Sequence, residues 1–260
     1  MEKYNSLQLR EVFHLEFLRR LGRAVKAENY AVKGGVNLRF FFKSFRYSED
    51  MDIDLRGIGV VPLKETVMKI LDNSSFQENL KPFGITGIIP PDIVKAKQTE
   101  TTQRFKVHLI SSSGEDLFTK VEFSRRGFYG NPVVGLVDDG ILRAYKLAPL
   151  LAPHYDNYSA VIQKLGALAA RKAVQARDIF DLYILSSQYD IGGKHVDNIG
   201  PEIFQKAYER IFEVEFEQFR DTVVSYLSGE DQMLYDKPKS WEEIRLKVVN
   251  FIEEARKSNA

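Results

Sequence analysis

An acidic strand pattern that follows a double-glycine turn is the feature that most limits how this chain can fold. Met51-Asp52-Ile53-Asp54-Leu55 alternates apolar and acidic residues, which is the periodicity of a β-strand. Upstream, the short apolar run Tyr30-Ala31-Val32 leads into Gly34-Gly35, which is typical of a strand that turns tightly into a helix. The sequence therefore predicts a strand, a glycine turn, a helix from Val36 to about Phe45, and then the acidic strand.

The acidic strand has the residues of a metal site. Asp50, Asp52 and Asp54 occupy alternate positions, and alternate side chains of a strand point to one face. Such a row of like charges is costly unless something neutralises it. Mg²⁺ does this well because it prefers carboxylate oxygens and keeps open positions for phosphate groups. We therefore expect Asp50 and Asp52 to hold Mg²⁺ or Mn²⁺, while the role of Asp54 stays open.

The glycine turn supplies the other half of a nucleotide site. At Gly34 and Gly35 backbone N–H groups can approach an anion closely, and the start of the following helix adds a partial positive charge. Ser48 comes two residues before Asp50, where its hydroxyl can shape the turn or contact a phosphate. Each piece alone is ordinary, since Gly-Gly is usually a turn and an acidic strand is usually a solvated edge. Their combination favours a metal beside a phosphate cradle, which nucleotidyl transfer needs.

The remaining pattern divides the chain into two parts. Helices are expected over residues 6–28 and 62–73, and strands over 104–110 and 117–123, joined as a hairpin by Ser112-Ser113-Gly114. From about Leu142 the pattern becomes helical, and Ser240-Trp241-Glu242-Glu243 is expected to be the capping box of the last helix. The sequence thus predicts a mixed-sheet α/β domain over residues 1–140 and a mostly helical domain, a C-terminal bundle, over residues 141–260.

A second charged cluster lies in the helical part. Lys164, Leu168 and Arg171 fall on one face of a helix that is rich in small residues. A lysine there can reach triphosphate oxygens as a point charge. Asp178, in the run Arg177-Asp178-Ile179-Phe180-Asp181, can orient that lysine or hold a hydroxyl. Taken alone, the cluster is more typical of a helix that carries surface charges.

These motifs together resemble a known family. Lys33-Gly34-Gly35 followed by Arg46-x-Ser48-x-Asp50-x-Asp52 resembles the signature of the AbiEii nucleotidyltransferases, the toxins of type IV toxin–antitoxin pairs, on the polymerase-β-like fold. That family also carries a lysine and an RDxxDL-like motif in its helical half, which Lys164 and Asp178 match. The resemblance covers about residues 30–190. It implies transfer of NMP from an NTP to a hydroxyl, with Lys164 and Asp178 acting on the triphosphate side.

The resemblance also implies partners and further site residues. A third carboxylate is usual on a neighbouring strand of this fold, and Glu122 is the candidate metal ligand. The toxin role implies an antitoxin encoded nearby, whose direct contact with the chain stays open, and it suggests RNA, specifically a tRNA 3′ end, as acceptor. The basic residues that we expect to contact that RNA are Arg39, Lys43, Arg46, Arg125 and Arg126.

Composition excludes several other classes. The 260 residues contain no cysteine, which excludes disulfides, thiolate zinc sites and a cysteine nucleophile. The net charge of +1 gives no global field, so RNA binding would need a local basic patch. No apolar run is long enough for a membrane helix, and we expect a cytoplasmic protein. The four histidines, His14, His108, His154 and His195, lack zinc-ligand spacing.

Two alternative functions remain open from the sequence. A phosphotransferase of the kinase type would move a terminal phosphoryl group to a protein or an RNA with similar metal ligands. A non-catalytic module would bind NTP or RNA without turnover, although the intact Asp50 and Asp52 pair argues against it.

Overall fold

A computed structural model describes residues 4–92, 98–189 and 200–258 of the chain. The chain forms two compact units. The first comprises residues 1–41, 47–128 and 132–154, and the second comprises residues 42–46, 129–131 and 155–260. Two short segments, 42–46 and 129–131, thus belong to the second unit although the chain around them belongs to the first.

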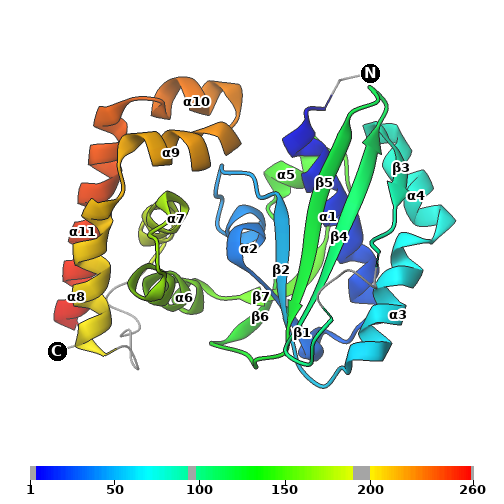
Figure 1. Ribbon diagram of the computed structural model, residues 1–260, viewed down its shortest axis with the longest axis horizontal. Helices are drawn as coiled ribbons and strands as arrows, with labels where there is room; N and C mark the ends of the chain where they lie inside the picture. The colour runs from blue at the N-terminus through cyan, green and yellow to red at the C-terminus, as the bar shows by residue number, and fades with distance from the viewer. Residues whose placement is uncertain (1–3, 93–97, 190–199, 259–260) are drawn as a thin grey trace. The chain divides into compact units, whose positions relative to one another are not determined.

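The first unit is built on a mixed seven-stranded sheet (Figure 1). Its strand order is β3-β4-β5-β2-β1-β7-β6. The strands are β1 (Tyr30–Lys33), β2 (Asp50–Leu55), β3 (Ile85–Ile89), β4 (Thr102–Ser111), β5 (Asp116–Ser124), β6 (Pro132–Leu136) and β7 (Leu151–Tyr155). β2 pairs antiparallel with β1 and parallel with β5. The acidic strand therefore lies inside the sheet, where neighbours on both sides fix its register.

Helices cover both faces of this sheet (Figure 1). Helices α1 (Ser6–Ala24), α3 (Val60–Leu71) and α4 (Ser74–Leu80) lie over one face, and α2 (Gly34–Phe41) lies against the other, while α5 (Asp139–Ala144) follows β6. The alternation of β2 explains why its apolar residues, Met51 and Ile53, belong to the core shared with α1 and α3. Its acidic residues are thereby directed to the face of α2.

The second unit is helical. It contains α6 (Asn157–Ala170), α7 (Ala176–Ser186), α8 (Pro201–Arg210), α9 (Phe216–Thr222), α10 (Gly229–Tyr235) and α11 (Pro238–Ser258). Phe180 on α7 and Phe219 on α9 pack in its core, and the Trp241 ring stacks on Phe219 with centroids 4.5 Å apart. Trp241 also donates its indole N–H to the carbonyl of Val214 at 3.0 Å, so the buried ring has its one donor satisfied. The core thus joins α7, α9 and α11.

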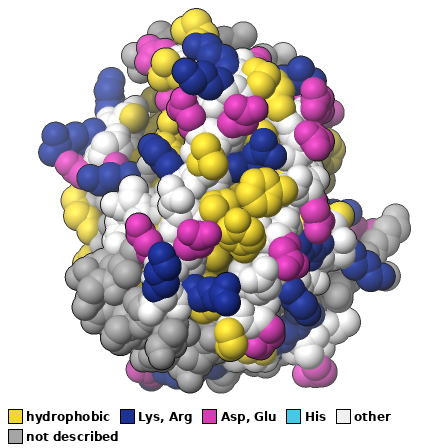
Figure 2. Space-filling model, turned by 90° about the vertical axis from the view of Figure 1, so that its left-hand side faces the viewer, with side chains coloured by type: hydrophobic (Ala, Val, Ile, Leu, Met, Phe, Trp, Pro, Cys, Tyr) yellow, Lys and Arg dark blue, Asp and Glu magenta, His cyan; other side chains and the backbone are white. Residues whose placement is uncertain are grey.

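The surface of the helical unit carries exposed apolar side chains. Phe212, Met233, Leu234 and Leu246 are each at least half exposed. On the face seen in Figure 2, hydrophobic side chains gather in patches among Lys, Arg, Asp and Glu. Within the described residues, no helix is long and apolar enough to cross a membrane.

The predicted elements are largely confirmed, and the larger differences are as follows. The first helix ends at Ala24 instead of residue 28, and the helix after the glycine turn ends at Phe41 instead of Phe45. β7 lies in a segment that was expected to be helical, because its parallel pairing with β1 outweighs the local pattern. The capping box at Ser240 is wrong: α11 already begins at Pro238, and the Ser240 hydroxyl donates to the carbonyl of Leu234.

Candidate active site

The glycine turn brings the start of α2 against the acidic strand. β1 runs directly into α2 at Gly34, whose φ of +68° is a conformation that favours glycine. β1 also pairs with β2 so that Lys33 lies opposite Asp52. A Cβ atom on Gly34 would lie 2.9 Å from the Oδ2 atom of Asp52. The missing side chain therefore allows the Asp52 carboxylate to sit beside the first turn of the helix.

The three aspartates of β2 have different environments. Asp50 is partly exposed and forms an ion pair with Lys120, Nζ to Oδ2, at 2.9 Å. Asp54 is buried and pairs with Lys33, Nζ to Oδ1, at 2.5 Å. A buried carboxylate that a lysine neutralises is a structural ion pair. The Asp54–Lys33 ion pair therefore links β2 to β1. The candidate metal ligands of this strand are Asp50 and Asp52.

Asp52 lies among other carboxylates. The parallel register of β2 and β5 places Glu122 directly beside it. Burial raises the pKa of Asp52, and the carboxylates of Glu122 and Asp50 raise it further, against the opposing effect of Lys120 and Lys33. A cation at this position would relieve both the repulsion and the cost of the buried charge.

Glu122 has a partner of its own. Arg104 on β4 holds the Oε2 atom of Glu122 with two guanidinium nitrogens, Nη2 at 2.6 Å and Nε at 2.7 Å. Over residues 4–92, 98–189 and 200–258, no group of three His, Cys, Asp or Glu side chains is gathered in a way that could hold a metal ion. Instead, the carboxylate of Asp50 forms an ion pair with Lys120, and that of Glu122 forms one with Arg104. Sequence patterns alone do not connect these two cations to the acidic strand.

Ser48 supports the entry into β2. Its hydroxyl donates to the backbone carbonyl of Asp50 at 2.8 Å, which is a local turn of the kind serine favours. The carbonyl of Glu49, one residue earlier, accepts a hydrogen bond from the Thr119 hydroxyl at 2.6 Å. Ser48 therefore fixes the backbone at the first candidate metal ligand, and its oxygen lone pairs still allow a contact as an acceptor.

A buried histidine completes this support. The Nε2 atom of His14 on α1 lies 2.8 Å from the Thr119 Oγ1 atom. Because the Thr119 hydroxyl gives its own proton to Glu49, His14 must donate from Nε2, which fixes the tautomer of the neutral ring. Burial, followed by the charge of Arg10, lowers the pKa of His14 to about 3. His195, another of the four histidines that lack zinc-ligand spacing, lies outside the described residues.

The buried His14 predicts a pH-dependent stability. Its pKa is 6.5 in the unfolded chain and about 3 in the folded protein, so the unfolded state binds one more proton between these values. Stability should be constant above about pH 6.5 and fall by about 1.4 kcal/mol per unit below it. Urea unfolding at pH 7.5 and pH 5 should show a smaller loss for His14→Gln, which can donate to Thr119 but does not titrate. Equal losses in the two proteins would contradict the buried neutral histidine.

The second cluster is a buried network of charges in the helical unit. Lys164 on α6 contacts two carboxylates of α7, Asp178 at 3.1 Å and Asp181 at 2.5 Å. Arg171 reaches the other oxygen of Asp178 at 2.7 Å, and Arg46 reaches Asp181 at 3.2 Å. Both carboxylates are fully buried and the Lys164 side chain is 13% exposed. The predicted contact between Lys164 and Asp178 is therefore present, and Asp181 and Arg46 belong to the same network.

The network fixes the charge of its members. Burial alone would lower the pKa of Lys164, but the carboxylates of Asp181 and Asp178 outweigh it and the pKa is raised. Burial alone would raise the pKa of Asp181, but the positive charges of Arg46 and Lys164 outweigh this effect, so the pKa is lowered. Lys164 therefore stays an ammonium group near neutral pH. Such a group presents a fixed positive charge to an anion.

Most of the predicted RNA-contacting arginines have structural partners. Arg39 forms an ion pair with buried Glu11 at 2.5 Å, and Arg46 lies in the network of Asp181. Arg125 donates to the carbonyls of Ile58 and Gly59 at 2.7 and 3.2 Å. Lys43 and Arg126 remain exposed. Three of the five predicted residues, Arg39, Arg46 and Arg125, thus have partners within the protein.

The family of the chain follows from a family model that matches residues 16–254, described as nucleotidyl transferase AbiEii toxin of a type IV toxin–antitoxin system. This match spans both the acidic strand and the Lys164 network. The chain belongs to the AbiEii family. It is accordingly a nucleotidyltransferase toxin that uses an NTP and is opposed by an antitoxin. A search of curated proteins found no match.

Solved structures share the fold of this AbiEii protein. JHP933 from Helicobacter pylori is 18% identical with a TM-score of 0.59, covering 99% of this chain and 95% of that one. A putative nucleotidyltransferase from H. pylori is 18% identical with a TM-score of 0.57, covering 96% and 94%. MenT4, a nucleotidyltransferase toxin from Mycobacterium tuberculosis, is 17% identical with a TM-score of 0.58, covering 98% and 88%. At these identities the likeness confirms the nucleotidyltransferase-like fold.

Proposed function

We propose that this AbiEii protein transfers NMP from an NTP to a hydroxyl group of RNA, with the 3′ end of a tRNA as acceptor. The observation that carries the proposal is the position of Asp52. Its half-buried carboxylate lies beside Asp50 and Glu122 and against the first turn of α2, which begins at Gly34. Carboxylate oxygens beside a helix N-terminus suit a divalent ion that carries phosphate groups. A tRNA acceptor would place the action of the toxin in the cytoplasm.

The donor set fits Mg²⁺ or Mn²⁺. Asp50 and Asp52 would hold the ion, and Glu122 would join them if it turned from Arg104. A bound divalent ion would polarise the α-phosphate and neutralise the charge on the leaving group. Gly34 and Gly35 would bind phosphate oxygens through backbone N–H groups, with Ser48 holding the backbone of Asp50 in place.

The reaction balances without any further reactant. The hydroxyl oxygen of the acceptor forms a bond to the α-phosphorus of the NTP, while the bond from that phosphorus to the bridging oxygen of the β-phosphate breaks. Pyrophosphate leaves with the electron pair, and the hydroxyl proton passes to solvent or to a nearby carboxylate. Lys164, which Asp178 and Asp181 keep in place and charged, would bind the triphosphate as a positive charge.

Labelled nucleotides separate this reaction from its alternatives. Purified protein, Mg²⁺ and total tRNA should give labelled RNA with α-labelled NTP and none with γ-labelled NTP, because the β- and γ-phosphates leave. Label from the γ position would instead indicate a phosphotransferase. Bound NTP without any labelled product would indicate a binding module, and label on protein instead of RNA would contradict the proposed acceptor.

A further inference from the structure

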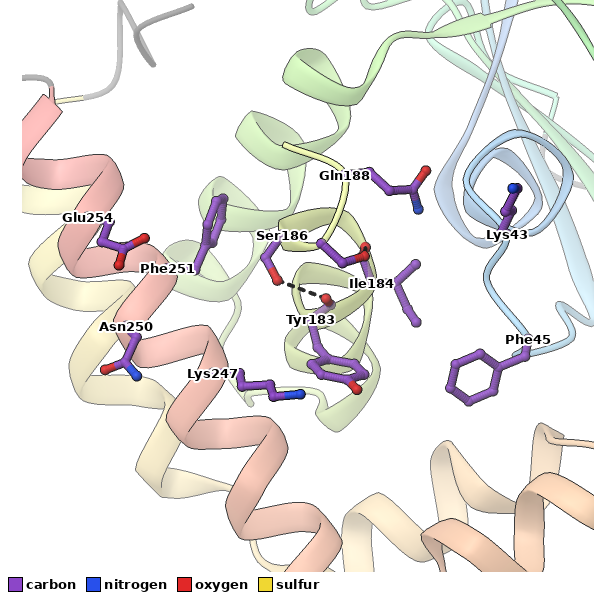
Figure 3. Close-up of a pocket in the computed structure, with 11 residues that line it drawn as sticks. Lys43, Phe45, Tyr183, Ile184, Ser186, Gln188, Lys247, Asn250, Phe251 and Glu254 are labelled. Carbon is purple, nitrogen blue, oxygen red and sulfur yellow. Dashed lines mark hydrogen bonds between the residues drawn. The ribbon is translucent and has the colours of Figure 1, made fainter. Parts of the chain in front are cut away.

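The helical unit contains a pocket outside the charge network of Lys164 (Figure 3). Its volume is about 620 Å³, which is within the range of about 300–1,000 Å³ that small-ligand sites have. Lys43 and Phe45 come from the segment after α2, Tyr183 and Gln188 from α7 and its end, and Lys247 and Asn250 from α11. Three separate parts of the chain therefore contribute side chains to one concave surface.

The charge of this pocket suits a phosphate-bearing ligand. Lys43 and Lys247 are both exposed, and neither forms an ion pair with any residue that the structure describes. Glu254 is the one carboxylate among the described lining residues. The two lysines thus differ from Arg39 and Arg46, whose charges are neutralised by Glu11 and Asp181. Neither ammonium group is paired with a carboxylate, so both can bind phosphate oxygens, and that of Lys247 lies 5.3 Å from the centroid of the Tyr183 ring.

The uncharged side chains of the pocket suit a nucleobase. The Tyr183 and Phe45 side chains are partly exposed, and both line the pocket (Figure 3). The Phe45 ring is held by Phe180 at 5.2 Å and by Tyr235 at 5.1 Å between centroids. Single-stranded RNA is commonly bound by stacking of unpaired bases on aromatic rings and by hydrogen bonds to their edges.

An amide group offers such hydrogen bonds. Gln188 donates its Nε2 group to the carbonyl of Phe42 at 2.7 Å, which orients its amide. Its Oε1 atom is then left as an acceptor for a base N–H group. Asn250 lines the same pocket from α11 and adds both a donor and an acceptor.

The backbone of Lys43 gives an independent indication. Its φ is +53°, a left-handed conformation just after the end of α2, where glycine is the usual residue. A lysine in this conformation carries a strain that glycine would avoid. Lys146 has a φ of +54° after α5, in the first unit. The chain therefore offers a matched pair of lysines in the same strained conformation, one in the pocket and one outside it.

We propose that this pocket binds a nucleotide of single-stranded RNA, with phosphates on Lys43 and Lys247 and the base against Tyr183 and Phe45. The inference rests on the proposed function in one respect, which is that RNA is the acceptor. The new element is the location of an RNA-binding site in the helical unit. Of the five basic residues that the sequence suggested for RNA contact, this proposal keeps Lys43 and adds Lys247.

The test measures RNA binding without catalysis. A short mixed-sequence single-stranded RNA with a 5′ fluorophore is titrated with the full-length protein, without NTP or divalent ion, and anisotropy is recorded at several salt concentrations. Lys43→Gly relieves the positive φ, so this variant should fold at least as well as the natural chain. Combined with Lys247→Gln, it should weaken binding by about tenfold or more and reduce the slope of log K against log salt by about 1.4.

The matched controls separate charge and stacking from structure. Lys146→Gly makes the same backbone change elsewhere and should leave the affinity for this RNA unchanged. Tyr183→Phe should bind nearly as well as the natural chain, whereas Tyr183→Leu should lose several-fold because the stacking surface is removed. Unchanged affinity in the Lys43→Gly, Lys247→Gln double variant would overturn the pocket assignment, and so would an equal loss in Lys146→Gly.

The outcome is independent of the proposed reaction. A protein that binds the probe through Lys43 and Lys247 but labels no RNA with α-labelled NTP would contradict the RNA acceptor and leave the pocket intact. A protein that labels RNA normally after loss of both lysines would contradict the pocket and leave nucleotidyl transfer intact.

Discussion

Replacing Asp52 by Asn should lower nucleotidyl transfer by about a thousandfold or more, because the variant keeps the shape of the side chain but loses a charged metal ligand. The same change should not reduce stability. Asp52 is half-buried; desolvation, followed by the carboxylates of Glu122 and Asp50, raises its pKa, so its charge is unfavourable in the protein without metal. The free energy of unfolding in urea is measured on the metal-free protein, and initial rates of NMP transfer are measured after Mg²⁺ is added.

Asp54→Asn is the matched control on the same strand. Asp54 pairs with Lys33 in a buried ion pair, so this variant should lose stability by about 1–3 kcal/mol and retain transfer in the folded protein. Asp50→Asn should follow Asp52→Asn, since both belong to the proposed metal site. Near-normal turnover in Asp52→Asn, or the same loss in Asp54→Asn as in Asp52→Asn, would remove the basis for the assignment.

Loss of Lys164 should have the largest effect on stability. Lys164→Ala leaves Asp178 and Asp181, both fully buried, with less compensating charge, and breaking a buried ion pair in this way costs about 3–5 kcal/mol. Urea unfolding should show this loss, and NTP binding should weaken in the protein that remains folded. Lys164→Arg should restore stability and NTP binding only in part, because a guanidinium group does not reproduce the geometry of an ammonium group.

A compensated variant separates the two roles of this lysine. Lys164→Met with Asp181→Asn removes one charge of each sign and keeps an acceptor for Arg46, so much of the stability should return. If Lys164 binds triphosphate, weak NTP binding should persist in this double variant. Recovery of NTP binding together with stability would show that Lys164 is a structural residue alone.

Local periodicity predicted much of the fold because several elements carry their own signal. The alternation of β2, the turn between β4 and β5 and the glycine turn before α2 are set by neighbouring residues. β7 was missed because its Leu151–Tyr155 segment is short, contains a proline and is defined by pairing with β1. The capping box at Ser240 failed because α11 starts two residues earlier, at Pro238, and Pro is well suited to the first turn of a helix.

The candidate site was predictable only where its residues are close in sequence. Asp50 and Asp52 share a face of one strand, so spacing alone places them together. The cations that hold Asp50 and Glu122, which are Lys120 and Arg104, depend on the register of three strands. The sequence likewise does not reveal that Arg39 and Arg46, two of the residues expected to contact RNA, form ion pairs with Glu11 and Asp181. Likewise, Lys43 and Lys247 meet in one pocket only through the packing of the helical unit.

Oxidation of the tRNA 3′ end tests whether NMP is transferred to its terminal hydroxyl. Natural tRNA and tRNA whose 3′-terminal diol has been oxidised with periodate are incubated in parallel with the protein, Mg²⁺ and α-labelled NTPs. The account predicts labelled natural tRNA and no labelled oxidised tRNA, because oxidation removes the hydroxyl that attacks the α-phosphorus. Equal labelling of both preparations, or labelling of neither while the protein still consumes NTP, would contradict it.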